Sequence, residues 1–211
     1  MQFSARVNES VAPYAISGLV ACGGASSRMG VDKSMLEYHG IPQRYFLYHL
    51  LEQCCEIVFL SLNESQVSTE NQDFKMVVDA DEYKNKGPIS ALMSFRKLYP
   101  GSSVLMLGCD YPNITLDILK DFLLTVLPER KSAAFASSDG NAYEPLLAFY
   151  HSEDLVKLPM QFETGNYSLQ TFLHEIEAIK YEARDLSSLL NINTREAYNQ
   201  FQHHLITEKH V

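Results

Sequence analysis

A glycine-rich segment near the N-terminus reads Cys22-Gly23-Gly24-Ala25-Ser26-Ser27-Arg28-Met29-Gly30-Val31-Asp32-Lys33, and it directly follows the apolar run 16–21. An apolar run of this length, ended by paired glycines, predicts a buried strand that leads into a loop. Glycines allow backbone N–H groups to approach an anion closely, serine hydroxyls can donate to it, and Arg28 and Lys33 supply positive charge. The segment therefore predicts a loop that binds a polyphosphate.

Two common phosphate loops do not fit this segment. The Walker loop needs a lysine directly after its second glycine, whereas two residues separate Gly30 from Lys33, and the spacing G-x-G-x-x-G is absent. The order Gly-Gly-x-Ser-x-Arg-Met-Gly-x-Asp-Lys after a first strand instead resembles the signature of the molybdenum cofactor guanylyltransferases, the molybdopterin-guanine dinucleotide biosynthesis protein A family of nucleotidyltransferases. A glycine-rich turn with incidental basic residues is the alternative, and a match of so many positions in order argues against it.

The composition narrows the class of protein. A length of 211 residues with 46% hydrophobic residues is enough for one large globular domain. A net charge of -9 argues against general binding to nucleic acid or to an anionic membrane surface. The four cysteines form no C-x-x-C pair, so we expect buried, reduced thiols in a cytoplasmic protein. No transmembrane stretch or signal peptide is indicated.

The hydrophobic pattern predicts an α/β protein. Strands are expected at 16–21, 56–61, 76–79, 103–109, 133–136, 143–150 and 178–181. Helices are expected at 42–55, 168–176 and 194–205, and others are expected to begin at 87, 115 and 152. Residues 63–73 are expected to form a loop. Apolar strands alternating with amphipathic helices predict a three-layer α/β/α fold with a mostly parallel sheet. The resemblance implies the Rossmann-like, nucleotide-diphospho-sugar transferase type of this fold.

The expected domain organisation is simple. We expect a loose extension at 1–14, a single nucleotidyltransferase domain at 15–206 and a frayed tail at 207–211. Within the domain, residues 15–130 form the expected nucleotide-binding half and residues 131–206 the expected acceptor-binding half. Ligands of such sheets bind at the carboxyl ends of the strands, where Lys33, Asp79 and Asp110 are all expected to lie.

Asp110 is the predicted metal ligand. It ends a buried strand and is followed by Pro112, which directs its carboxylate into the expected crevice. A triphosphate brings Mg²⁺, which takes oxygen ligands from one or two carboxylates and from phosphate. Capping of the next helix is the alternative role, for which Thr115 is better placed. The resemblance implies the same Mg²⁺ role, because the family carries a matching Cys-Asp-x-Pro element.

A second acidic residue precedes a Gly-Pro pair. Asp79 lies eight positions before Gly87, which is similar to the family's Asp before Gly-Pro-Leu-x-Gly and implies a contact with the nucleotide. Asp81 is an equally possible counterpart, and a plain turn role for Asp79 also stays open. Ala91 stands where the family usually has glycine.

Two segments of the sequence bear on the identity of the two substrates, the nucleotide and the pterin. Family members that use CTP tend to carry Ala-Ala-Gly where this chain has Cys22-Gly23-Gly24, so the resemblance implies GTP, whose guanine would be read by backbone groups that the glycines expose. Leu190-Asn191-Ile192-Asn193-Thr194 resembles the family's Asn-x-Asn-Thr-Pro-Glu element, with Arg195 in place of the proline. Asparagine amides both donate and accept, which suits a pterin or its phosphate, although Asn193 and Thr194 can also cap the last helix.

The predicted function is transfer of GMP from GTP to the phosphate of molybdopterin, with release of pyrophosphate and with Mg²⁺ as cofactor. The predicted catalytic residues are Lys33, Arg28 and Asp110. The predicted binding residues are Ala21, Cys22, Gly23, Gly24, Ser26, Arg28, Lys33, Asp79, Gly87, Asp110, Asn191 and Asn193. Alternatives are a CTP-using enzyme, another nucleotidyltransferase on this fold, or a nucleotide-binding module without catalysis. We expect a monomer or weak homo-oligomer with transient contacts to other cofactor-biosynthesis proteins.

Overall fold

The strands of the chain form one mixed sheet. The computed structural model describes residues 14–22, 32–67 and 73–208. Within them, seven strands lie in the order β3-β2-β1-β4-β6-β5-β7. Their bounds are β1 Tyr14–Ala21, β2 Cys55–Leu62, β3 Met76–Val78, β4 Val104–Gly108, β5 Ala133–Ala136, β6 Tyr143–Tyr150 and β7 Ile179–Tyr181. Strand β6 is antiparallel to both neighbours, and the other paired strands are parallel, which confirms the predicted mostly parallel sheet.

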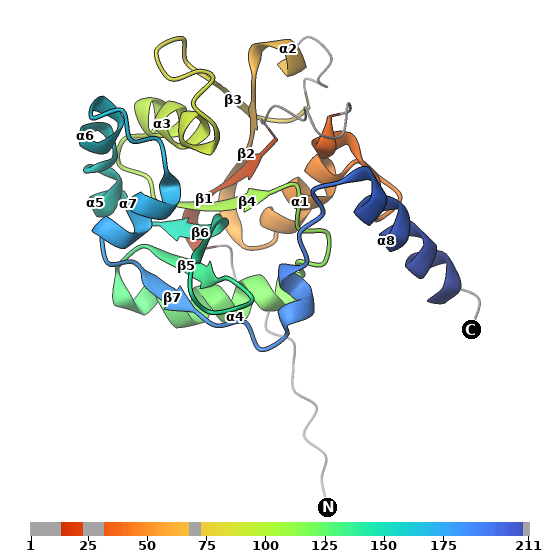
Figure 1. Cartoon of the computed structure of the whole chain (residues 1–211). Helices are drawn as coiled ribbons and strands as arrows, with labels where there is room; N and C mark the ends of the chain where they lie inside the picture. Colours follow the sequence, from red (N-terminus) through yellow and green to blue (C-terminus); the bar gives the residue numbers. More distant parts are fainter. Residues whose placement is uncertain (1–13, 23–31, 68–72, 209–211) are drawn as a thin grey trace, which may run out of the picture.

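Helices cover both faces of this sheet (Figure 1). The α-helices are α1 Gln43–Leu51, α2 Glu64–Val67, α3 Pro88–Leu98, α4 Leu116–Val126, α5 Ser152–Leu155, α6 Leu158–Glu163, α7 Leu169–Glu175 and α8 Arg195–Glu208, and the 3-10 helices are η1 Lys33–Met35, η2 Leu127–Glu129 and η3 Leu186–Leu189. Helices α1 and α4 pack into one hydrophobic cluster with the sheet, and α3 and α7 into a second. The result is the predicted three-layer α/β/α architecture.

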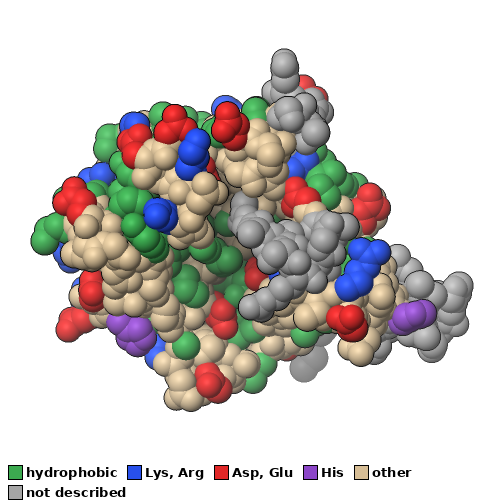
Figure 2. Space-filling view, turned by 45° about the horizontal axis from the view of Figure 1, so that its top comes forward, with side chains coloured by type: hydrophobic (Ala, Val, Ile, Leu, Met, Phe, Trp, Pro, Cys, Tyr) green, Lys and Arg blue, Asp and Glu red, His purple; other side chains and the backbone are tan. Residues whose placement is uncertain are grey.

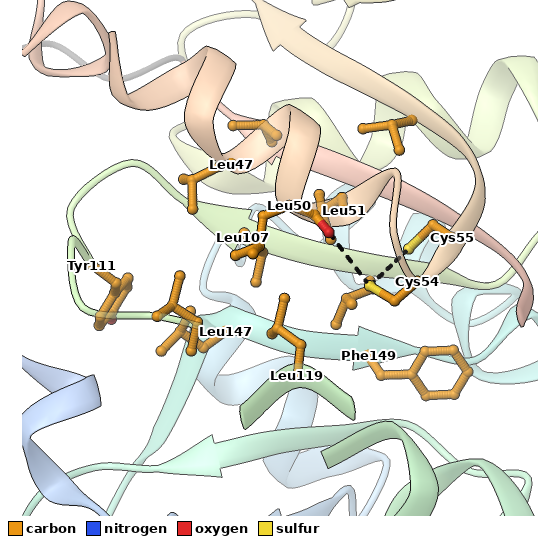
Figure 3. Close-up of a cluster of buried hydrophobic side chains, with 14 of the residues drawn as sticks. Leu47, Leu50, Leu51, Cys54, Cys55, Leu107, Tyr111, Leu119, Leu147 and Phe149 are labelled. Atoms are coloured by element: carbon orange, nitrogen blue, oxygen red, sulfur yellow. Dashed lines mark hydrogen bonds between the residues drawn. The ribbon is translucent and has the colours of Figure 1, made fainter. Parts of the chain in front are cut away.

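The two hydrophobic clusters explain why the strands read as continuous apolar runs. Neighbouring strand residues point to opposite faces, so Leu19 and Val20 enter different clusters and both are fully buried. Leu47 and Leu51 of α1 meet Leu107 of β4 in the first cluster (Figure 3). Burial of this kind stabilises the fold by about 25 cal/mol per Å² of apolar surface.

Two predictions on either side of β2, the bounds of one helix and an uninterrupted loop, were wrong. The helix expected at 42–55 ends at Leu51, because a turn in which the Cys54 N–H donates to the Leu51 carbonyl at 3.0 Å leads directly into β2. Cys54 is nevertheless buried in the first cluster, which is why it matched the helical spacing. The loop expected over 63–73 contains α2, a single turn too short to show a hydrophobic period.

Other predictions about local structure are confirmed. The strands predicted at 133–136 and 143–150 are β5 and β6, which form an antiparallel hairpin, and Gly140 in its turn has a φ of 73°, which a residue with a side chain rarely adopts. Thr115 is the N-cap of α4, since its hydroxyl accepts from the Ile118 N–H at 3.4 Å. Two other elements are longer than predicted: β1 begins at Tyr14, inside the extension expected at 1–14, and α8 continues to Glu208, beyond the expected end at 205 and into the expected tail.

Candidate active site

Lys33 is held at the start of the 3-10 helix η1. Asp32 is the N-cap of this helix, and its Oδ1 accepts from the N–H of Ser34 at 2.9 Å and from the Ser34 hydroxyl at 2.7 Å. The side chain of Lys33 extends away from the cap, and its Nζ donates to Oδ1 of Asn193 at 2.6 Å. The lysine therefore contacts one of the two predicted asparagines.

Asp110 lies just after β4 and contacts the same segment. Its Oδ2 accepts from Nδ2 of Asn191 at 2.9 Å, and its backbone carbonyl accepts from the N–H of Ile192 at 2.9 Å. Residues 191–193 thus bond to Asp110 on one side and to Lys33 on the other. Three segments that are far apart in the sequence meet at the carboxyl ends of the strands.

Electrostatics also links Lys33 with Asp110. Burial raises the pKa of the Asp110 carboxyl above its usual value, while the hydrogen bond from Asn191 and the positive charge of Lys33 act in the opposite direction. The hydrogen bonds of Asn191 to Asp110 and of Lys33 to Asn193, two positions apart, bring the predicted pair to the same side of the molecule.

Gly108 makes room for the carboxylate of Asp110. A Cβ at this last position of β4 would lie 2.6 Å from Oδ1 of Asp110 and 2.9 Å from Cβ of Leu146. Both distances are far below van der Waals contact. The position of the carboxylate thus depends on the missing side chain two residues earlier.

Two oxygen atoms at this point are suited to a divalent cation. Oδ1 of Asp110 and Oδ1 of Asn191 are enclosed, and within the described residues neither accepts a hydrogen bond. Carboxylate and amide oxygens are ligands that Mg²⁺ accepts, and this ion usually takes few protein ligands because it keeps waters and phosphates. The described residues hold no group of three or more His, Cys, Asp or Glu arranged for a metal.

A cavity of about 640 Å³ opens between the carboxyl ends of β1, β2 and β3 and the start of α3. It is lined by Ala21, Ser61, Asn63, Glu64, Ser65, Asp79, Lys84, Asn85, Gly87, Pro88, Ser90 and Ala91. Two of the predicted nucleotide contacts besides Asp79, namely Ala21 and Gly87, are in this lining. Gly87 has a φ of 78° and is the N-cap of α3, so the glycine is required by the backbone.

The two candidate aspartates have different environments. Asp79 lines the cavity, and burial raises its pKa from 3.8 to about 6. Asp81 is exposed and pairs with Nζ of Lys84 at 2.8 Å, a contact that lowers the pKa of its carboxyl. Lys84 also lies 3.9 Å from Glu64 of α2, across the cavity rim. The geometry favours Asp79 as the carboxyl that a bound molecule would meet.

Some of the predicted binding residues are not seen with a side chain in the cavity. The thiol of Cys22 is buried and donates to the Val20 carbonyl at 3.5 Å, so its side chain does not face the cavity. Gly23, Gly24, Ser26 and Arg28 lie outside the described residues. The other cysteines are buried as expected, and all four are free thiols.

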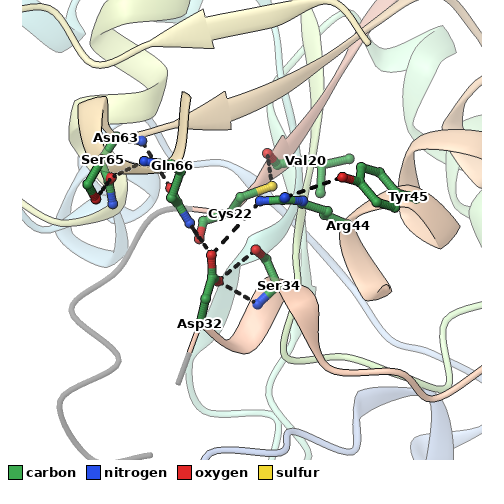
Figure 4. Close-up of polar contacts among 9 residues, drawn as sticks. All are labelled: Val20, Cys22, Asp32, Ser34, Arg44, Tyr45, Asn63, Ser65 and Gln66. Atoms are coloured by element: carbon green, nitrogen blue, oxygen red, sulfur yellow. Dashed lines mark hydrogen bonds and ion pairs between the residues drawn. The ribbon is translucent and has the colours of Figure 1, made fainter. Parts of the chain in front are cut away.

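Sequence reasoning missed a polar cluster at the base of the predicted loop (Figure 4). Gln66 of α2 donates through Nε2 to the Cys22 carbonyl at 3.2 Å and to Oδ2 of Asp32 at 2.8 Å. Buried Arg44 of α1 places Nη1 3.9 Å from the same Asp32 oxygen. The sequence could have pointed to Asp32, because this residue belongs to the Asp-Lys pair of the motif. Nothing in the sequence placed Gln66 beside it.

The charges on this side of the molecule are mixed. Figure 2 shows acidic and basic side chains interspersed over the face turned toward the viewer, with apolar side chains between them. No helix in the described ranges is both long and apolar enough to cross a bilayer.

The chain matches the family model described as "MobA-like NTP transferase domain" over residues 18–179. It belongs to the MobA-like NTP transferase family. This match includes the glycine-rich segment, the cavity and Asp110, and it ends before Asn191. The family assignment makes the protein a nucleotidyltransferase.

Curated relatives carry related names. The MobA-like chain is 28% identical over 193 residues to a molybdenum cofactor guanylyltransferase of Syntrophotalea carbinolica, covering 88% of this chain and 90% of that protein. It is 29% identical over 184 residues to a molybdenum cofactor biosynthesis bifunctional protein of Synechocystis. This alignment includes 87% of the present chain but only 52%, about half, of the relative.

Solved structures confirm the fold. Molybdopterin-guanine dinucleotide biosynthesis protein A of Archaeoglobus fulgidus superposes with a TM-score of 0.73 at 17% identity, over 91% of this chain and 100% of that one. A CMP:2-keto-3-deoxy-manno-octonic acid synthetase complexed with CTP gives a TM-score of 0.65 at 13% identity, over 92% and 99% of the two chains. The MobA-like chain thus has the nucleotide-diphospho-sugar transferase type of fold.

Proposed function

We propose that this protein transfers GMP from GTP to the terminal phosphate of molybdopterin and releases pyrophosphate. The observation that carries the proposal is the juxtaposition of Lys33 and Asp110, both bonded to residues 191–193, at the carboxyl edge of the sheet. The cavity lined by Asp79 and Gly87 lies at the same edge and has room for a nucleoside. The names of the relatives supply the substrates.

The chemistry needs no nucleophile from the protein. An oxygen of the acceptor phosphate attacks the α-phosphorus in line, a new P–O bond forms, and the bond to the bridging oxygen of the β-phosphate breaks as pyrophosphate leaves. Negative charge grows on the α-phosphate and on the leaving group. The ammonium of Lys33 is preorganised by Asn193 to offset that charge, which is the main way proteins accelerate such transfers.

Asp110 and Asn191 are the residues that would hold Mg²⁺ in this proposal, through their two enclosed oxygens. When bound with the nucleotide, the ion would neutralise phosphate charge. The protein positions these oxygens through the hydrogen bond between the two side chains and through the space left by Gly108.

The choice of base is part of the proposal. Guanine offers N1–H and exocyclic N–H donors together with acceptors, and the cavity lining contains both carboxylate acceptors and amide or ammonium donors, among them Asp79, Asn85 and Lys84. Because GTP is a cytoplasmic metabolite, we also propose the cytoplasm as the place of reaction. Arg28 is included as a second cation on the phosphates, on the strength of the motif alone.

Titration of the purified protein with GTP and with CTP, each with Mg²⁺, tests the nucleotide. We expect GTP to bind at least about tenfold more tightly, which corresponds to 1.4 kcal/mol. Incubation with molybdopterin should then give the guanine dinucleotide and one pyrophosphate per product. A preference for CTP would support the cytidylyltransferase alternative, and nucleotide binding without pyrophosphate release would support a non-catalytic module.

A further inference from the structure

Gln66 bonds to both residues that flank segment 23–31. Its Nε2 donates to the carbonyl of Cys22, which precedes the segment, and to the carboxylate of Asp32, which follows it. The two acceptor distances are 3.2 and 2.8 Å, so both amide hydrogens are used. One side chain thus joins the end of β1 to the start of η1, across ten positions of sequence.

The side-chain amide of Gln66 is itself held by Asn63, the residue before α2. Its Oε1 accepts from the N–H of Asn63 at 3.0 Å, and its backbone N–H donates to Oδ1 of Asn63 at 3.1 Å. These reciprocal bonds orient the amide plane, so that Nε2 points toward Asp32 (Figure 4). The contacts give α2, a helix of one turn, a specific role in the fold.

Asp32 is held from three sides. Gln66 and the guanidinium of Arg44 approach its Oδ2, at 2.8 and 3.9 Å, and Ser34 donates twice to its Oδ1. Arg44 is 2% exposed, so its charge is poorly screened by water. A carboxylate with this many partners cannot rotate freely, and the peptide that follows it is fixed as well.

Lys33 is the residue that follows. Its backbone opens η1, and its Nζ reaches Asn193 at 2.6 Å. We infer that Gln66 is a positioning residue for the transfer reaction, and that it acts through Asp32 to hold Lys33 where the phosphates would bind. This inference rests on the proposed function. The side-chain amide of Gln66 bonds to Asn63, Cys22 and Asp32, and its effect on Lys33 passes through Asp32.

The test is a double-mutant cycle with Gln66→Met and Lys33→Ala. Methionine keeps the length of the side chain and removes both donors. We expect Gln66→Met to lower kcat/KM for GTP by about 10- to 100-fold, the range that misplacement of a catalytic group by about 1 Å produces. In the Lys33→Ala background the same change should cost less than about threefold, because the group that Gln66 positions is already absent.

Gln53→Met is the matched control. Gln53 is exposed in the turn after α1, and its side-chain amide donates to the His49 carbonyl at 3.1 Å, so its change should leave kcat/KM within about twofold. If Gln66→Met does not fold, Gln66→Asn, which withdraws the amide by one methylene, takes its place in the cycle. Additive effects of the two changes, or full activity of both Gln66 variants, would overturn the inference. Failure of the unmodified protein to transfer any nucleotide would instead overturn the proposed function, and with it this role.

Discussion

Nζ of Lys33 and Oδ1 of Asn193 lie 2.6 Å apart although 160 positions separate the two residues in the sequence. This hydrogen bond joins the first 3-10 helix to the segment that precedes α8. It fixes a flexible four-carbon side chain in one direction. The cation is therefore preorganised before any phosphate binds.

Replacement of Lys33 by alanine should remove transfer while leaving the fold intact. We expect the turnover number to fall by at least about a hundredfold, the scale found for single electrostatic stabilisers, and Tm to change little, because the hydrogen bond from the ammonium to Asn193 is exposed to solvent. Steady-state kinetics and a thermal melt measure the two effects. Lys131→Ala, at an exposed lysine just before β5, is the control and should retain activity. Unchanged turnover in the Lys33 variant would count against its role.

Gly108→Ala should disturb the carboxylate of Asp110. The new Cβ would lie 2.6 Å from Oδ1 of Asp110 and 2.9 Å from Leu146, so one of them must move. We expect the free energy of unfolding to fall by about 1–3 kcal/mol and binding of Mg²⁺ with GTP to weaken. Denaturant unfolding and calorimetric titration measure these changes. Gly101→Ala is the matched control, since a Cβ there meets nothing within 4 Å.

Asp79 should give the protein a pH-dependent stability. Its folded-state pKa of about 6 lies above the usual 3.8, so its contribution is fully favourable below pH 4 and is lost as the pH rises through 6. Asp79→Asn removes this titration. Between pH 4 and pH 7 we expect the wild type to lose about 1 kcal/mol of unfolding free energy relative to the variant, after allowance for partial exposure. Urea unfolding at both pH values measures the difference, and parallel curves for the two proteins would refute it.

The attachment of α8 should depend on Tyr38. The ring of this buried residue makes edge contacts with Tyr198 and Phe201, at centroid distances of 5.3 and 5.4 Å. Tyr38→Ala should reduce the free energy of unfolding by about 3 kcal/mol and accelerate hydrogen exchange in α8, because both aromatic contacts are lost. Tyr38→Phe keeps the ring and should behave like the wild type. Slow exchange in α8 of the alanine variant would show that other contacts hold the helix.

The sequence was most informative where one local pattern fixes both conformation and chemistry. Paired glycines after an apolar run predicted the end of β1, and an aspartate after a fully apolar strand predicted the location of Asp110. The rule that ligands meet at the carboxyl ends of parallel strands then placed Lys33, Asp79 and Asp110 at one edge, as the structure has them.

The contacts that the sequence could not predict depend on tertiary structure. The amide of Gln66 comes from a one-turn helix with no period, and only the folded chain brings it to Asp32. The different burial of Asp79 and Asp81 could likewise not be predicted from the sequence, because both follow the same short strand. The pairing of α8 with Tyr38 gave no sequence signal, since aromatic residues at helical spacing are common in any core.

The late position of residues 191–193 also has a consequence for biosynthesis. A ribosome translates from the N-terminus at about 5–20 residues per second, so the residues of one site are made at different times. Lys33 and Asp110 therefore leave the ribosome well before Asn191 and Asn193, which fix their side chains. A nascent chain that ends before these residues lacks the two side-chain amides that hold Lys33 and Asp110. The proposed catalysis must therefore wait until this late segment has been translated.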